Sequence, residues 1–132
     1  MTSFKSYPAA AAALLLSTTL LAGDLPADDI VRSPVHDARP VMLAALESPD
    51  GTAHGVLTGE VADAITRQFK ANSPIYIDVS TQKRYRQSGC ARLSVVFWQE
   101  GVKLPEAASA RKQTIEFGIN YCLDGRPPQS MQ

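Results

Sequence analysis

Alternation of apolar and polar side chains is the clearest pattern in the second half of the chain, and it predicts three β-strands. The alternating segments are Ile75–Val79, Leu93–Phe97 and Ile115–Tyr121. Successive side chains of a strand point to opposite faces, so each segment is expected to bury one face. Upstream, Val41–Leu46 and Ala53–Thr58 flank the turn sequence Ser48–Gly51, and they predict two further strands joined as a hairpin.

A helical period marks the segment between the two predicted groups of strands. Its apolar face comprises Val61, Ala64, Ile65, Gln68 and Phe69, and the charged residues Glu60, Asp63, Arg67 and Lys70 point away. Thr58 is the predicted N-cap, and Asn72 followed by Pro74 is expected to end the helix. We expect the apolar face to pack on the sheet, with a partner-binding or membrane helix as the alternative.

The N-terminal segment has the three-part layout of a secretory signal peptide. Lys5 precedes an apolar run, Pro8–Ala22, and small residues follow as far as Ala27. This run is shorter than the roughly 20 apolar residues that span a bilayer. We therefore expect residues 1–27 to be a signal peptide, cut between Ala22 and Ala27, and the mature protein to be periplasmic or secreted without a stable membrane anchor. An uncleaved anchor is the alternative.

Export to an oxidising compartment makes a disulfide the expected state of Cys90 and Cys122, which are the chain's two cysteines. If their strands are antiparallel neighbours and the cysteines face each other, the whole register follows. The resulting pairs are Leu93 with Ile119, Val95 with Phe117, and Phe97 with Ile115. One register thus bonds the cysteines and gathers six large apolar side chains on one face, and a slip of one residue would undo both.

These elements predict one α+β domain over residues 40–123. We expect a two-layer sandwich, with one helix on an antiparallel sheet of about five strands and one disulfide. Residues 28–39 lack an apolar period and are expected to form an extended arm. Residues 124–132 are expected to form a flexible tail.

Charge and aromatic positions suggest one surface for a partner. The chain has 13 basic and 13 acidic residues, so no overall field would draw it to nucleic acid or to an anionic membrane. Basic side chains nevertheless surround Tyr85 in an acid-free stretch, and the predicted register puts Trp98 and Val96 on the sheet face opposite the core. The predicted partner-binding residues are Trp98, Val96, Lys83, Arg84, Tyr85, Arg86 and Arg92. The alternatives are a solvated loop and strand edge for the basic residues, and burial of Trp98 under the arm or the tail.

The residues offer little catalytic chemistry. His36 and His54 are the chain's two histidines, and no sequence neighbour orients either one as a general base. His36, Asp37 and His54 match no standard zinc spacing, so neither a metal nor a cofactor is expected. We predict a non-enzymatic binding module. The alternatives are a small secreted enzyme or enzyme inhibitor that works through His54 or the Ser48–Gly51 turn, and a structural domain that oligomerises through an edge strand.

Two strings, Val95–Gly101 and Phe117–Cys122, resemble small periplasmic proteins of conjugative type IV secretion operons. The resemblance covers roughly residues 54–128. It implies a non-enzymatic accessory of an export apparatus with a protein partner in the cell envelope, and it brings no catalytic residues. The lipoproteins of those systems carry a lipidated cysteine where this chain has Asp24, which argues against an outer-membrane-anchored subunit.

Overall fold

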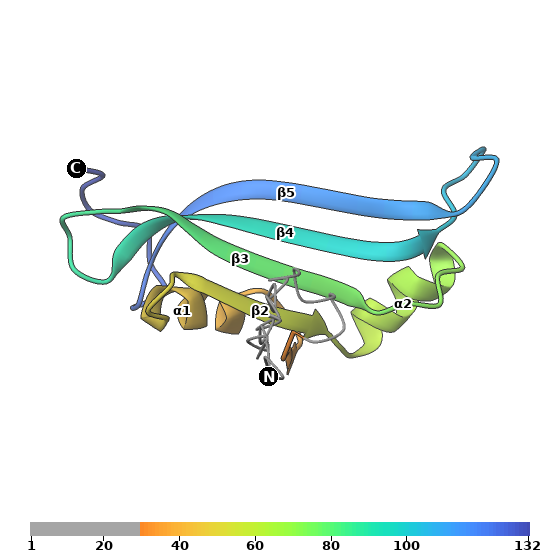
Figure 1. The fold of residues 1–132 in the computed structure, drawn as a ribbon, viewed down its shortest axis with the longest axis horizontal. Coiled ribbons are helices and arrows are strands. Elements are labelled where there is room, and N and C mark those ends of the chain that lie inside the picture. The colour runs from red at the N-terminus through yellow and green to blue at the C-terminus, as the bar shows by residue number, and fades with distance from the viewer. Residues whose placement is uncertain (1–29) are drawn as a thin grey trace, which may run out of the picture.

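The computed structural model describes residues 30–132, which form one five-stranded sheet and two helices (Figure 1). The strands are β1 (Ser33–Val35), β2 (Thr52–Leu57), β3 (Ile75–Arg84), β4 (Cys90–Val102) and β5 (Arg111–Cys122), and the helices are α1 (Arg39–Glu47) and α2 (Glu60–Gln68). The strands lie side by side in chain order. The first pair is parallel and the other three pairs are antiparallel, so the α+β class is confirmed with a mixed sheet. The predicted signal peptide lies outside the described residues.

The predicted register of the last two strands is confirmed pair by pair. Cys90 lies opposite Cys122 and the two are disulfide-bonded, with 4.0 Å between their Cα atoms. The three predicted apolar pairs, Leu93 with Ile119, Val95 with Phe117, and Phe97 with Ile115, are all present. We call the face with these side chains the inner face and the opposite one the outer face.

Helix α1 covers part of the inner face and completes the core. Its buried side chains are Val41, Met42, Ala45 and Leu46, and they pack with Ile77, Val79, Leu93 and Val95 of the sheet. Gly55 of β2 allows the helix to come close, because a Cβ atom there would lie 2.7 Å from Cγ2 of Val41. Such an overlap cannot be relieved without moving packed atoms.

The prediction of a strand over Val41–Leu46 is wrong, since this segment belongs to α1. A short apolar run does not separate a buried strand from a helix by its periodicity alone. Two local features favour the helix. Pro40 lies in the first turn, where proline is well tolerated, and the Asp37 carboxylate accepts the Arg39 backbone N–H at 2.9 Å.

Helix α2 forms as predicted, but the prediction that its apolar face packs on the sheet is wrong for most of that face, since Ala64, Ile65 and Gln68 are exposed. Val61 is 68% exposed and Ala62 is the buried residue of the helix. Its N-cap is Gly59, not Thr58. The Thr58 hydroxyl instead donates to the Val35 carbonyl at 3.2 Å, which fastens β2 to β1.

Both chain ends of the described part are better ordered than the sequence predicted. The expected arm contains β1, which pairs with β2. The expected tail is hydrogen-bonded to the turn between β3 and β4. Arg86 donates its N–H to the Gln132 carbonyl at 2.7 Å, and the Gln129 N–H donates to the Gln87 side chain at 2.8 Å.

Within residues 30–132, neither helix has the length and apolar content needed to cross a membrane. The disulfide is compatible with an oxidising, extracellular type of compartment.

Replacing both cysteines by alanine should lower the free energy of unfolding by about 3–4 kcal/mol, because the disulfide restricts the unfolded chain by closing a loop. The separation of 32 residues between the cysteines sets that loop. Urea denaturation of the oxidised protein and of the double variant measures the difference. Equal midpoints would mean that the β4–β5 register holds without its covalent link.

Candidate functional site

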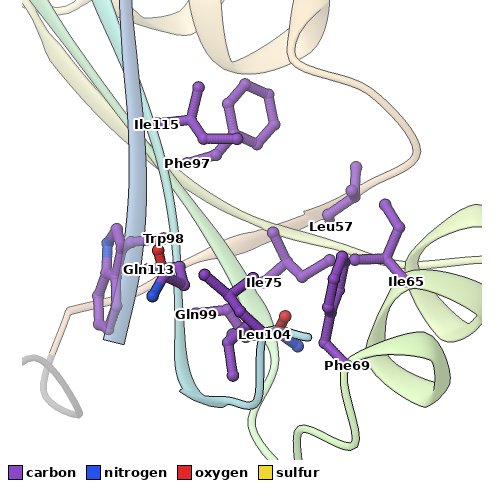
Figure 2. A pocket seen from close by; sticks show the side chains of 11 residues that line it. Leu57, Ile65, Phe69, Ile75, Phe97, Trp98, Gln99, Leu104, Gln113 and Ile115 are labelled. Carbon is purple, nitrogen blue, oxygen red and sulfur yellow. The ribbon is translucent and has the colours of Figure 1, made fainter. Parts of the chain in front are cut away.

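The inner face is only partly covered, and an apolar groove lies beyond α1. Its volume is about 330 Å³. The groove is lined by Leu57, Ile65, Phe69, Ile75, Phe97, Val102, Leu104 and Ile115, together with Trp98, Gln99 and Gln113 (Figure 2). These residues come from β2 to β5, from α2 with the residue after it, and from the loop between β4 and β5. We refer to this cavity as the groove.

Several side chains of the groove expose much of their apolar surface. Ile115 is 67% exposed, Leu104 is 37% exposed and Ile65 is 36% exposed. Figure 2 shows Ile65 and Phe69 on the α2 side, with Ile115 and Phe97 on the sheet. Contiguous exposed apolar surface of this kind typically marks an interaction site.

Polar contacts help to hold α2 near the sheet, together with the burial of Ala62. The Gln99 amide donates to the Thr66 hydroxyl at 3.0 Å and to the Ser73 carbonyl at 2.9 Å. Lys103 in the β4–β5 loop donates its N–H to the Phe69 carbonyl at 3.0 Å. These contacts hold α2 and the residues that follow it beside the sheet, and the space between their apolar side chains and those of the sheet stays open.

A cluster of polar and aromatic side chains occupies the outer face around Asp78. The Asp78 carboxylate accepts hydrogen bonds from Arg32 at 2.9 Å, His54 Nδ1 at 2.7 Å and Trp98 Nε1 at 2.7 Å. The Arg32 guanidinium lies 4.5 Å from the centre of the Tyr76 ring, and that ring packs on Trp98. We call these five residues the Asp78 cluster.

Two opposing effects set the pKa of Asp78. Burial is the larger single effect and acts to raise the pKa, because it removes water from the charged carboxylate. The hydrogen bonds from His54, Trp98 and Arg32 together outweigh burial, so the pKa lies below its ordinary value. The ionised carboxylate thus holds together β2, β3, β4 and the segment before β1.

The predicted partner-binding residues Trp98 and Val96 do lie on the outer face, where both are half-buried. Trp98 is engaged by its neighbours, since it bonds to Asp78 and carries the Lys112 ammonium 4.3 Å from its ring centre. Arg32 from the predicted arm covers part of it, 5.6 Å from the same ring. Trp98 is therefore in large part a structural residue of the Asp78 cluster.

The predicted basic residues do not form one surface with Trp98. Tyr85 and Arg92 both bond to the Asn120 side chain, at 2.7 and 3.2 Å. Arg92 and Trp98 lie six positions apart in β4, which is about 20 Å along a strand. The Lys83 ammonium lies 5.7 Å from the centre of the Tyr85 ring, and Lys83 faces Arg92 across β3 and β4.

Two further basic residues of that prediction are used by the fold. The Arg84 guanidinium donates to the carbonyls of Leu46 and Ser48, at 3.4 Å each, at the end of α1. The backbone of Arg86 bonds to the last residue of the chain. The Arg84 side chain and the Arg86 backbone therefore stabilise the fold.

The residues considered for catalysis or metal binding lie apart. His36 donates from Nδ1 to the Thr58 carbonyl, whereas His54 belongs to the Asp78 cluster. Within the described part of the chain, no group of three or more metal-ligating side chains forms. The Ser48–Gly51 turn forms as predicted and is fastened by Asp50, whose pKa falls to about 2 because Ser48 and Thr52 donate hydrogen bonds to it.

Comparisons of this chain with protein-family models, with curated proteins and with solved structures found no match.

Changing Asp78 to Asn should lower the free energy of unfolding at pH 7 by about 2 kcal/mol, because hydrogen bonds to a charged carboxylate are lost. The depressed pKa of Asp78 contributes stability above the ordinary value of 3.8, and this contribution disappears as the pH falls through the lower pKa of the folded state. The two proteins should therefore converge in acid. Thermal denaturation of both between pH 2 and pH 7 tests this, and a gap that stays constant with pH would contradict it.

Proposed function

We propose that this protein is a non-enzymatic binding module of the bacterial cell envelope, and that the groove holds apolar side chains of a protein partner. The observation that carries the proposal is the exposed apolar lining of the groove, formed by Ile65, Leu104 and Ile115 beside the buried core. A protein that keeps such a surface open in water gives up the stability that its burial would provide. A partner that fills the groove would recover that free energy.

The shape and chemistry of the groove favour a protein segment as its occupant. Its walls are aliphatic and aromatic, and the Gln99 amide already bonds to Thr66 and Ser73. Such walls favour the binding of large apolar side chains, as in protein interfaces where a few apolar side chains fill a pocket. The positions of α2 and of the β4–β5 loop set the width that such a segment must fit.

The proposed cellular location and the source of the partner rest mainly on the sequence. The signal-peptide layout of residues 1–27, together with the disulfide, supports a periplasmic location for the mature protein. The resemblance to periplasmic accessories of conjugative type IV secretion supports an export apparatus as the source of the partner. The groove replaces the Trp98 face as the proposed contact surface, because Trp98 is engaged in the Asp78 cluster.

A second candidate, enzymatic function, draws on the contact between His54 and Asp78. A histidine hydrogen-bonded to a carboxylate is the arrangement that orients a general base. Here the same carboxylate also binds Arg32 and Trp98, which is typical of a structural anchor. Changing His54 to Gln separates the two functions, since the amide can still donate to Asp78 but cannot act as a general base, so partner binding by the variant argues for the binding module.

Changing Ile65 to Asn should weaken partner binding by about tenfold or more, because it puts an amide against the apolar wall. Val61 to Asn is the matched control. Both residues belong to α2 and both are exposed, but only Ile65 lines the groove. A photo-crosslinking amino acid at Leu104, in cells that carry the export apparatus, reports binding, and mass spectrometry maps the cross-linked peptide.

The proposal requires a cross-link to an apolar segment of an envelope protein that is lost with Ile65→Asn and kept with Val61→Asn. A cross-link that survives Ile65→Asn would overturn the groove as the contact surface. Cross-linking to lipid alone would overturn a protein partner.

A further inference from the structure

The strand β5 leaves a long edge of the sheet open. The strand order places β5 at one edge and β1 at the other (Figure 1). β1 has only three residues, whereas β5 has twelve, and Thr114–Gly118 is exposed throughout. A long open edge is a template for pairing with another strand, and short or covered edges avoid this.

Backbone contacts next to the disulfide show which residues of β5 face the open side. The Cys122 N–H donates to the Arg126 carbonyl and not to β4, while the next residue, Leu123, donates to Gly89. Cys90 and Cys122 therefore form a pair without mutual backbone hydrogen bonds, as their short Cα separation of 4.0 Å also indicates. The backbone N–H and C=O groups of successive residues in a strand point to alternate sides. Over Thr114–Asn120 the even-numbered residues therefore point these groups toward the open edge, and the odd-numbered residues point them toward β4.

The usable edge is centred on Phe117. Arg126 takes the Cys122 N–H at one end, and the β-bulge between Gln99 and Val102 interrupts the regular pairing of β4 with β5 at the other. The stretch between these limits, Thr114–Asn120, has Phe117 at its midpoint. Phe117 is 42% exposed, and its neighbour on the same face, Ile115, also projects from the inner face without cover.

We infer that two copies of this chain pair along β5, antiparallel, with Phe117 of each copy meeting at a two-fold axis. This register keeps the inner faces of both copies on one side, since odd residues then face odd residues. It places Ile115 opposite Ile119 of the other copy, and Glu116 opposite Gly118. The self-complementary contact is the kind that a two-fold axis generates.

Charge complementarity supports this register. The Arg92 side chain lies over Gly118, because a Cβ atom at that glycine would be 2.5 Å from the guanidinium. In the dimer the Glu116 of one copy lies opposite that glycine, and so beside Arg92 of the other copy. Within one chain, neither Glu116 nor Arg92 forms an ion pair with another described residue. Moving the axis to Glu116 would instead oppose two like charges.

The dimer goes beyond the proposed function and uses a surface that meets the groove at Ile115. The groove opens between α2 and the sheet, whereas the dimer uses the free backbone groups of β5. The two surfaces share Ile115, which the second copy would cover on its β5 side. Glu116 and Arg92 do not line the groove, so loss of self-association on changing them is distinguishable from loss of binding in the groove.

A pair of charge reversals tests the dimer. Glu116→Arg and Arg92→Glu should each weaken self-association of the mature, oxidised protein by about tenfold or more, since each brings like charges together twice across the axis. Mixed one to one, the two variants should form a dimer about as strong as the original, because both contacts then join opposite charges. Sedimentation velocity measures association, and circular dichroism verifies folding.

Cross-linking tests the register independently. Phe117→Cys should form a disulfide between copies, because residues that face each other without backbone hydrogen bonds have Cα atoms about 4.5 Å apart. Ile115→Cys is the matched control, since its two copies would lie about 13 Å apart along the strands. A monomer at all concentrations, a mixture of charge variants that fails to associate, or equal cross-linking at both positions would each overturn the inference.

Discussion

The link between Cys90 and Cys122 is the constraint on which the rest of this structure depends. It joins β4 to β5 at one end and so selects which residues of β5 face each residue of β4. In that register, as far as the β-bulge that follows Gln99, the odd-numbered side chains of both strands form the inner face, with its core and its groove. The even-numbered side chains form the outer face. The same choice directs the backbone groups of Glu116 and Gly118 toward the open edge.

The two faces then serve different purposes. On the outer face, hydrogen bonds to the ionised Asp78 tie together three strands and the N-terminal segment, without a large apolar area. On the inner face, α1 provides apolar packing over one part of the sheet and leaves the groove bare over another. An extended sheet with one helix on part of its core face is therefore stable while still exposing Ile115 and Phe117.

Strands β2 to β5 and the β4–β5 register could be predicted from the sequence, because alternation with a period of two marks strands and the cysteine pair fixes one register. Strand β1 was expected to be part of an extended arm, since its three residues carry no periodic signal. The helix over Val41–Leu46 could not be predicted from periodicity, because a short apolar run fits either element, and Pro40 in its first turn is a weaker signal than the run itself. The groove could not be predicted, since it depends on how far α2 stands from the sheet. The role of Arg32 was missed for a similar reason: its partner Asp78 is 46 residues away in the chain.

The most direct test of this account is amide hydrogen exchange along β5, measured by NMR at low and at high protein concentration. The register predicts that the amides of Ile115, Phe117 and Ile119 are protected at every concentration, because they bond to β4. The amides of Glu116 and Gly118 should exchange quickly in dilute protein and become protected as the dimer forms. Protection of the even-numbered amides in dilute protein, with fast exchange of the odd-numbered ones, would contradict the register on which the account depends.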